Sequence, residues 1–150
     1  MIKNEVKILK QLDHPNITKL HEVYENDDEV CLIIDYVNGK RLFDQVVRRG
    51  KLSERETAII MKQLLLTLSH LEANTIIHRD IKPENMLLSF DEEGQVKLKL
   101  IDFGLSTDHL KRDMIKKCGT AGYTAPEVLC GEPYDFKADL YSAGIVMYIW

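Results

Sequence analysis

The sequence predicts an α+β fold, in which strands and helices occupy separate stretches of the chain. Two observations carry this prediction. Residues 17–24 and 30–37 have the pattern of strands and are separated by the polar, turn-rich residues 25–29, so we expect a hairpin. Residues 1–12, and the residues that follow Ser53, instead carry apolar side chains at three- and four-residue spacing, which is typical of helices.

The helical segments have recognisable limits. The first helix is expected to end at the Asp-His-Pro-Asn run of residues 13–16, and a short helix is expected to end near Gly50. Ser53 and Glu56 form a predicted capping box, in which each side chain bonds a backbone amide of the other residue. A long helix should therefore begin directly after Ser53.

In the second half of the chain the helical spacing of apolar residues gives way to other patterns. Apolar and polar residues alternate over 96–100, as in a half-exposed strand, and residues 101–127 are irregular for longer than an ordinary connection, which indicates a functional loop. The segment from Asp139 to Trp150 is almost wholly apolar, so as a helix it should be surrounded by protein on most sides. No cap precedes the first helix and the last helix is still under way at Trp150, so we expect the chain to be part of a larger domain.

Composition excludes several classes of protein. The 150 residues are 45% hydrophobic and 29% charged, with a net charge of -4 and scattered basic residues, so no nucleic-acid partner is expected. Three cysteines without C-x-x-C spacing argue against disulfides and zinc and favour a reducing, cytoplasmic location. No signal peptide is recognisable, and the apolar run 143–150 is too short to span a bilayer, so no membrane insertion is expected.

Three motifs occur in a fixed order. They are His-Arg-Asp-Ile-Lys-Pro-Glu-Asn at 78–85, Asp-Phe-Gly at 102–104 and Ala-Pro-Glu at 125–127. Each alone is compatible with an ordinary turn or helix start, but together they resemble the signature set of protein kinases. The Lys-Pro-Glu-Asn run is similar to the Ser/Thr-specific form. Residues 100–106 and 119–129 look most like the calcium/calmodulin-dependent and calcium-dependent protein kinases.

This resemblance implies an incomplete two-lobed, kinase-like fold. Residues 1–34 would be the remainder of the small lobe, with the helix called αC and strands; residues 35–39 the hinge; and residues 40–150 the first part of the mainly helical large lobe, up to its central helix. The implied activity is transfer of the ATP γ-phosphate to Ser/Thr hydroxyls of a protein substrate, with Mg²⁺ as cofactor. A regulatory domain outside this chain would fit the same relatives.

The resemblance also implies roles for the motif residues. Asp80 would accept the proton of the substrate hydroxyl, and Lys82 would steady the transferred phosphoryl group. Thr120 matches a position whose hydroxyl bonds that Asp and Lys. Asn85 and Asp102 would provide the oxygen ligands of magnesium.

Further positions match the nucleotide pocket. Ile34 would be the gatekeeper, the backbones of Asp35 and Val37 would bond adenine, and Leu87 would close the pocket from below. Glu5 matches the αC glutamate, but neither its strand lysine nor a glycine-rich loop occurs in the sequence. We therefore expect the 150 residues alone to be inactive.

Other matches concern structure and regulation. Leu9, Leu20, His78 and Phe103 match a hydrophobic stack that links the two lobes, and Asp139 would anchor the catalytic-loop backbone. The resemblance also places Arg79 in the class of kinases whose catalytic-loop arginine is commonly neutralised by a phosphate on the loop between Asp102 and Glu127. Lysines occupy the usual phosphorylation site here, so the sequence favours a carboxylate such as Asp113 as the partner of Arg79.

Two alternatives remain at this point. A pseudokinase or scaffold would use the same surfaces to bind proteins, but would have no need of Asp80, Lys82, Asn85 and Asp102. A small-molecule kinase of similar fold is disfavoured by the Ala-Pro-Glu motif and the loop that precedes it.

Overall fold

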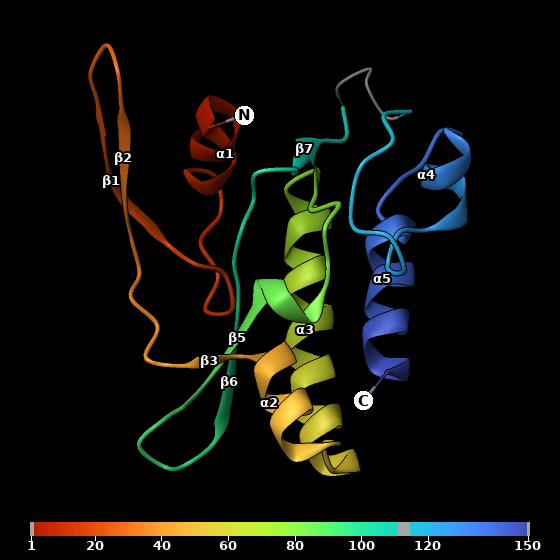
Figure 1. The fold of residues 1–150 in the computed structure, drawn as a ribbon. Helices are drawn as coiled ribbons and strands as arrows, with labels where there is room; N and C mark the ends of the chain where they lie inside the picture. Colours follow the sequence, from red (N-terminus) through yellow and green to blue (C-terminus); the bar gives the residue numbers. More distant parts are fainter. Residues whose placement is uncertain (1, 111–114, 150) are drawn as a thin grey trace.

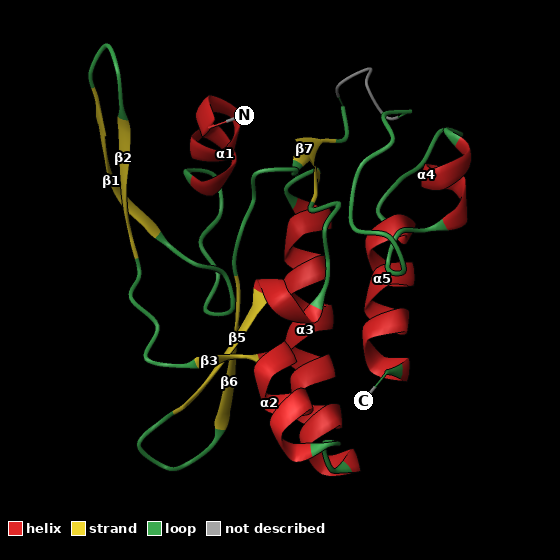
Figure 2. Cartoon of the chain, viewed as in Figure 1, coloured by secondary structure: helices red, strands yellow, loops and turns green. Residues whose placement is uncertain are grey.

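The computed structural model describes residues 2–110 and 115–149 (Figure 1). A two-stranded hairpin and the first helix lie on one side, a long helix runs through the centre, and the last two helices lie on the other side (Figure 1). Figure 2 shows that loops make up most of the chain between strand β6 and helix α5. Among the described residues, no helix combines the length and apolar character needed to cross a membrane.

The predicted hairpin is confirmed, although its strands are shorter than expected. Strands β1 (Leu20–Glu25) and β2 (Val30–Ile34) are antiparallel, and helix α1 (Ile2–Leu9) contacts β1. The sequence predicted strand from residue 17, but Ile17 pairs in parallel with Leu100, in strand β6, instead of with β2. The chain is therefore extended at residue 17 because of a contact that is distant in sequence.

A second sheet has three short antiparallel strands in the order β3–β5–β6. They are β3 (Lys40–Arg41), β5 (Met86–Phe90) and β6 (Val96–Leu100), so the strand predicted over 96–100 is confirmed. Asp91 closes the β5–β6 turn, because its Oδ1 accepts hydrogen bonds from the backbone amides of Glu93 (3.1 Å) and Gln95 (2.7 Å).

Helices α2 (Leu42–Arg49) and α3 (Glu54–Ala73) follow the predicted limits. Gly50 ends α2 with φ 79°, a left-handed conformation that glycine adopts without steric cost. The capping box is confirmed: Ser53 Oγ accepts from the Glu56 amide at 3.3 Å, and a Glu56 carboxylate oxygen accepts from the Ser53 amide at 3.0 Å. Leu64 and Leu71 of α3 are fully buried and anchor the main core, which α3 forms with β6 and α5.

Short elements order the loops of the second half. Strands β4 (Ile76–Ile77) and β7 (Thr107–Asp108) pair with each other, and the 3-10 helix η1 (Pro83–Asn85) precedes β5. Helix α4 (Pro126–Cys130) lies on the side of α5 (Lys137–Tyr148) that is away from α3 (Figure 1). Residues 101–127 are therefore less irregular than predicted, since β7 and the start of α4 lie within them.

Helix α5 differs from its prediction. Its buried residues are the small or short side chains Ala138, Asp139, Ser142, Ala143 and Val146. Large apolar side chains on the same helix are exposed, including Met147 at 56% and Tyr148 at 87%. Within the described residues, one face of α5 packs against α3 and the opposite face is open.

Candidate active site

The loop of residues 78–85, between β4 and β5, is held in place from helix α5. The carboxylate of Asp139 accepts a hydrogen bond from the His78 amide through Oδ2 at 2.7 Å and from the Arg79 amide through Oδ1 at 2.9 Å. The Asp139 side chain is buried, and this burial raises its pKa. Arg79 itself has φ 68°, so the loop reverses through a left-handed, non-glycine residue.

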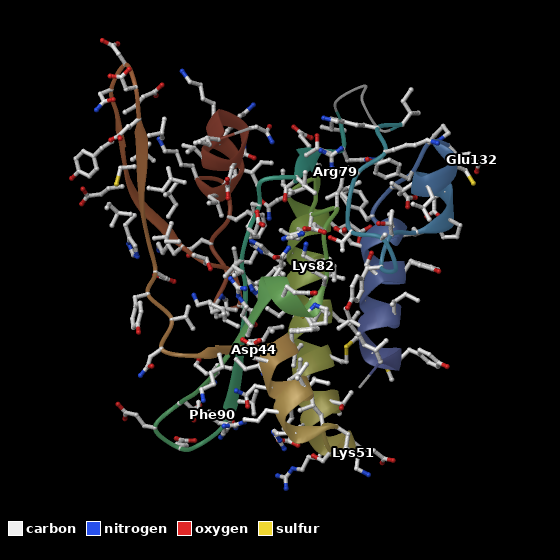
Figure 3. All side chains as sticks on the ribbon, viewed as in Figure 1. Asp44, Lys51, Arg79, Lys82, Phe90 and Glu132 are labelled. Atoms are coloured by element: carbon white, nitrogen blue, oxygen red, sulfur yellow. The ribbon has the colours of Figure 1, made fainter. Side chains whose placement is uncertain are left out.

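The same loop carries a compact group of polar side chains. Lys82 Nζ lies 2.8 Å from Asp80 Oδ2 and donates to Thr120 Oγ1 at 2.7 Å. The Thr120 hydroxyl donates to Asp80 Oδ1 at 2.6 Å, although the two residues are 40 positions apart. Figure 3 shows Lys82 near the middle of the molecule. Asp80 and Thr120 are therefore joined both directly and through Lys82.

Asp80 is held in its ionised form. Burial is the largest influence and would raise its pKa, because only 8% of the residue is exposed. The hydrogen bonds from Lys82 and Thr120, with the lysine charge, together outweigh burial, so the pKa of Asp80 lies below its ordinary value. The carboxylate can therefore accept a hydrogen bond or a proton throughout the neutral pH range.

Asn85 and Asp102 offer oxygen atoms close to this group. Asn85 Nδ2 donates to the Asp80 carbonyl at 3.0 Å and to Asp80 Oδ2 at 3.1 Å. Both partners are acceptors, so the amide cannot be reversed, and its Oδ1 is left on the side away from Asp80. The Ile101 amide bonds the Asn85 carbonyl at 2.9 Å, which brings the next residue, Asp102, beside Asn85.

These two oxygen donors fit a magnesium ion. Asp102 has φ 63° and is exposed, and its Oδ1 accepts from the Gly104 amide at 3.2 Å. Magnesium is usually bound by one or two protein oxygen ligands, with water or phosphate oxygens completing the shell. A carboxylate and an amide oxygen on adjoining backbone segments match that requirement.

Glu5 approaches the same region from helix α1. Burial raises the pKa of Glu5, and the negative charge of Asp102 raises it further, whereas the Phe103 amide bonds the carboxylate and acts in the opposite direction. Glu5 therefore experiences the charge of Asp102 at the start of the Asp-Phe-Gly motif. Such a pair is stabilised by a cation, which is the role that the resemblance gives to a lysine.

The predicted hydrophobic stack has the burial expected of it. His78 and Phe103 meet edge to face, with ring centroids 4.8 Å apart, and both are buried. Leu9 of α1 is buried in the same core, and Leu20 packs against it while partly exposed. Leu9 and Phe103 thus belong to one core, and Phe103 contacts His78 of the 78–85 loop.

The residues predicted to bind adenine are not part of the hydrogen-bonded group around Asp80 in the described residues. Ile34 ends β2 with 47% of its surface exposed, and the half-buried Leu87 lies on β5. The Asp35 amide donates to the Lys19 carbonyl at 3.0 Å, and the Val37 carbonyl accepts from the Gly39 amide at 2.8 Å. Within residues 2–110 and 115–149, no backbone hydrogen bond uses the Asp35 carbonyl or the Val37 amide.

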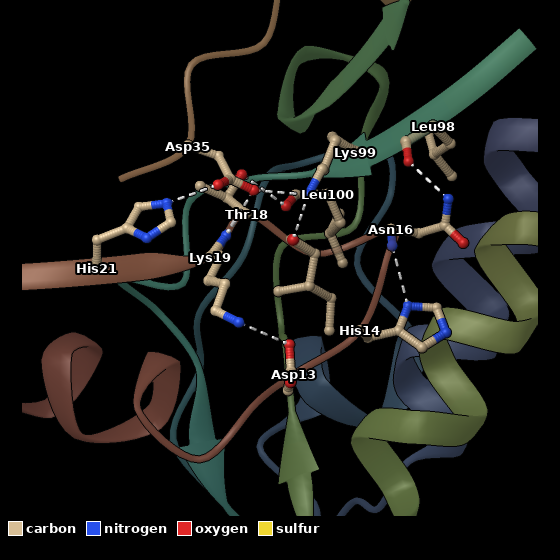
Figure 4. A network of polar contacts seen from close by, with 11 residues as sticks. Asp13, His14, Asn16, Thr18, Lys19, His21, Asp35, Leu98, Lys99 and Leu100 are labelled. Carbon is tan, nitrogen blue, oxygen red and sulfur yellow. Dashed lines mark hydrogen bonds and ion pairs between the residues drawn. The ribbon is translucent and has the colours of Figure 1, made fainter. Parts of the chain in front are cut away.

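The side chain of Asp35 forms a contact network that the sequence reading did not anticipate (Figure 4). Its carboxylate accepts from Lys99 Nζ at 2.7 Å, lies 2.8 Å from His21 Nε2 and accepts from the Lys19 amide at 3.3 Å. Lys99 also donates to the Ile17 carbonyl at 3.0 Å. The hydrogen bond from Lys99 is the largest cause that lowers the pKa of Asp35 to about 2, so this carboxylate stays ionised.

Arg79 has neutral partners in the described part of the chain. Its Nε donates to the Leu105 carbonyl at 2.6 Å, and one terminal nitrogen donates to the Tyr134 hydroxyl at 3.1 Å. The carboxylate suggested from the sequence, Asp113, lies outside the described residues.

The chain is a mixed α+β domain in which the 78–85 loop gathers Asp80, Lys82 and Asn85 beside Thr120. The chain belongs to the protein kinase domain family, whose family model matches residues 1–150.

Three relatives illustrate the similarity. The human serine/threonine-protein kinase DCLK3 is 43% identical over 149 residues, which cover 99% of this chain and 23% of the relative. Calcium-dependent protein kinase 3 of Plasmodium yoelii yoelii is 43% identical, with 98% of this chain and 27% of the relative covered. Calcium/calmodulin-dependent protein kinase type 1 of Macrobrachium nipponense is 40% identical, with 99% and 43% covered. The chain thus spans less than half the length of each of these relatives.

Proposed function

We propose that the protein containing this chain is a serine/threonine kinase that transfers the ATP γ-phosphate to hydroxyls of protein substrates. The observation that carries the proposal is the Asp80–Lys82–Thr120 group, in which a lysine and a hydroxyl hold one buried carboxylate ionised. A scaffold has no use for a charge pair of this kind, whose burial costs free energy. The length of the relatives leaves room for a regulatory domain elsewhere in the protein.

Phosphoryl transfer depends mainly on positioning and charge neutralisation, and the proposed roles follow that rule. Asp80 orients the substrate hydroxyl and accepts its proton, while Lys82 stabilises the charge on the transferred group. Asn85 and Asp102 hold Mg²⁺, which neutralises phosphate charge when it is bound. Thr120 belongs to the loop before α4, and its hydroxyl bonds both Asp80 and Lys82, which fixes the positions of the two side chains relative to each other.

The nucleotide would lie against the segment that joins β2 to β3. We propose that residues 35–39 act as the hinge between a small lobe, to which 1–34 belong, and a large lobe, to which 40–150 belong. The Asp35 carbonyl and the Val37 amide, which have no backbone partner in the part of the chain that the structure describes, are one acceptor and one donor, which matches the adenine edge. Ile34 and Leu87 would contact the base, and Glu5 would bind the lysine that orients the phosphates.

An activity assay with a matched pair of proteins tests the proposal. The complete protein is incubated with Mg²⁺, radiolabelled ATP and peptides that differ only in Ser, Thr or Tyr at the acceptor position. We expect label on the Ser and Thr peptides alone, and none after chelation of Mg²⁺ by EDTA. The 150-residue chain, assayed in parallel, should be inactive, because the glycine-rich loop and the strand lysine do not occur in its sequence.

Two outcomes would contradict this proposal. Incorporation into the Tyr peptide alone would refute the serine/threonine assignment. No incorporation into any peptide, from a complete protein that still binds ATP, would favour a pseudokinase instead.

Thr120 offers a test of the polar group itself. Thr120→Ala in the complete protein should lower kcat by roughly 10- to 100-fold, because it removes a hydrogen bond to a charged group, worth about 1.5–3 kcal/mol. Thr120→Ser keeps the hydroxyl and should retain most of the activity. Steady-state kinetics with ATP and a Ser peptide measure both variants. Equal losses in the two variants would show that the methyl group, rather than the hydroxyl, is what matters.

A further inference from the structure

Two histidine side chains meet where the loop that follows helix α1 contacts helix α3. The ring centroids of His14 and His70 lie 5.0 Å apart, with 31° between the ring planes, and both residues are partly buried. His14 belongs to the segment 13–16, whereas His70 lies in the last turn of α3. We name the segment 13–16, with its contacts to α3 and β6, the 13–16 joint, because it connects α1 to the centre of the molecule.

The hydrogen bonding of His14 requires a neutral ring. Its Nδ1 lies 3.2 Å from the backbone amide of Asn16, and a backbone amide can only donate (Figure 4). Nδ1 is therefore an acceptor, and the proton of the neutral ring is on Nε2. A proton on Nδ1 would set two N–H groups against each other, so a charged His14 has to leave this position.

His70 is in the same situation, at a longer contact. Nδ2 of Asn74 donates to the His70 carbonyl at 2.8 Å, which fixes the orientation of the amide, and the same nitrogen lies 3.4 Å from His70 Nε2. An N–H₂ group can only donate, so Nε2 is the acceptor and this ring is also neutral. Each histidine thus faces a donor that it would have to displace on gaining a proton.

The charges that act on His14 oppose its protonation. Burial is the largest cause that lowers its pKa, followed by the charge of His70 in α3 and that of Lys99 in β6. The carboxylate of Asp35 is engaged by Lys99 at 2.7 Å, and Asp13 is exposed and already in an ion pair.

The direction of the pH effect follows from this lowered pKa. While the joint is closed, His14 binds fewer protons than a histidine with the ordinary value of 6.5. Once the joint opens, the ring returns to that ordinary value, so the open form binds more protons. The closed joint is therefore fully stable above the ordinary value and loses stability as the pH falls below it.

The 13–16 joint also holds the chain to α3 and β6 through one side chain. Asn16 Nδ2 donates to Gln63 Oε1 of α3 at 2.9 Å and to the Leu98 carbonyl of β6 at 2.7 Å. The backbone amide of the same residue bonds His14. Displacement of the histidine ring therefore acts directly on the residue that fastens the joint.

We propose that the His14–His70 pair makes the 13–16 joint sensitive to acid: below about pH 6.5 the rings gain protons, repel each other and release the segment from α3. Release displaces α1, and with it Glu5, so phosphoryl transfer slows. The effect on activity rests on the proposed function, whereas the opening of the joint does not.

Hydrogen–deuterium exchange of the complete protein tests the opening. It is measured at about pH 7.5 and about pH 5.5, one unit above and below the ordinary histidine value, and corrected for the intrinsic pH dependence of exchange. Protection of residues 13–20 should fall by about threefold to tenfold at the lower pH, the upper figure being the linkage effect of one histidine that is neutral only in the closed joint. Protection around Leu64, in the middle of α3, should stay within about twofold.

Matched variants separate the pair from other effects of acid. His14→Asn and His70→Gln each keep an amide oxygen that can accept the same hydrogen bond, and neither new side chain gains a proton. Each variant should reduce the acid response, and the double variant should abolish it while matching the wild type at about pH 7.5. His21→Gln is the control, because the His21 ring is more exposed and lies 2.8 Å from Asp35, which accommodates a proton; the response should persist in this variant.

The kinase assay gives the second readout. Between the same two pH values, the wild-type rate on a Ser peptide should fall more than the rate of the double variant. Inactivity of the wild type at both values would count against the proposed function alone, because exchange still reports the joint.

Three results would overturn the proposal for the pair. They are an acid response of residues 13–20 below about twofold, a response that the double variant retains, and an increase in protection by Zn²⁺ at neutral pH that needs both histidines, which would make the pair a metal site instead.

Discussion

Replacing Asp80 by Asn in the complete protein is expected to lower kcat by roughly 10²–10⁴-fold, the range observed when a positioned general base is removed. The change is nearly isosteric, so the fold should be preserved. The amide places an N–H₂ group where the carboxylate now accepts from Thr120 at 2.6 Å or contacts Lys82 at 2.8 Å. An N–H₂ group at the Oδ2 position would face the Lys82 ammonium, which has no acceptor, whereas one at the Oδ1 position would require the Thr120 hydroxyl to turn and accept. In either case the negative charge beside Lys82 and the proton acceptor for the substrate hydroxyl are lost.

Single-turnover kinetics with a Ser peptide measure this effect, and binding of a fluorescent ATP analogue should remain within about twofold, since Asp80 makes no proposed contact with the nucleotide base. Asp27→Asn is a matched control, because Asp27 is exposed in the β1–β2 turn. Because the pKa of Asp80 lies below its ordinary value of about 4, the wild-type rate should show no acidic limb from this group between about pH 6 and 8. A variant that kept more than about a tenth of the wild-type rate would contradict the role of Asp80 as a general base.

Asp139→Asn is expected to destabilise the protein by about 2–4 kcal/mol, although this residue contacts no substrate. The two Asp139 oxygens accept separately from the His78 and Arg79 amides, and only 4% of the residue is exposed. An amide has one acceptor and one donor group, so one backbone N–H would face another N–H in a buried place. The melting temperature should fall by several degrees, and kcat should fall with it because the loop backbone loses its anchor.

The control for this change is Glu132→Gln, which neutralises an exposed carboxylate in the same part of the chain and should leave the melting temperature within about one degree. Scanning fluorimetry of the complete protein, with and without a nucleotide, measures both variants. If Asp139→Asn melted like the wild type, the two hydrogen bonds could not be what holds the loop in place.

Local signals explain what the sequence predicted correctly. The hairpin depends on two strands joined by a turn, and the start of α3 depends on a capping box four residues long, so both are specified by neighbours in the chain. Asp80 and Thr120 were expected to meet only because their motifs resemble those of a known family. Nothing in their spacing places a hydroxyl 40 residues away on that carboxylate.

Tertiary contacts explain what was missed. Alternation along β6 makes Lys97 and Lys99 look equivalent, yet Lys99 is half-buried against Asp35 whereas Lys97 is largely exposed. Which lysine meets an acid depends on where the 35–38 segment lies, and periodicity carries no such information. Gln63 was one residue of a helix pattern, and its bonds to both Asn16 and β6 became apparent only in three dimensions.

Arg79 and Asp102 are both non-glycine residues with left-handed backbones, at φ 68° and 63°. Each such conformation costs on the order of 1 kcal/mol, which the rest of the fold must offset. The backbone is thus strained next to Asp80 and at Asp102, two of the residues to which a catalytic role is proposed. Glycine would remove this cost at either position, but at Arg79 it would also remove the contacts with Leu105 and Tyr134, and at Asp102 the carboxylate proposed to bind Mg²⁺. The residue that is best for thermal stability at Asp102 is therefore not the one that the proposed activity needs.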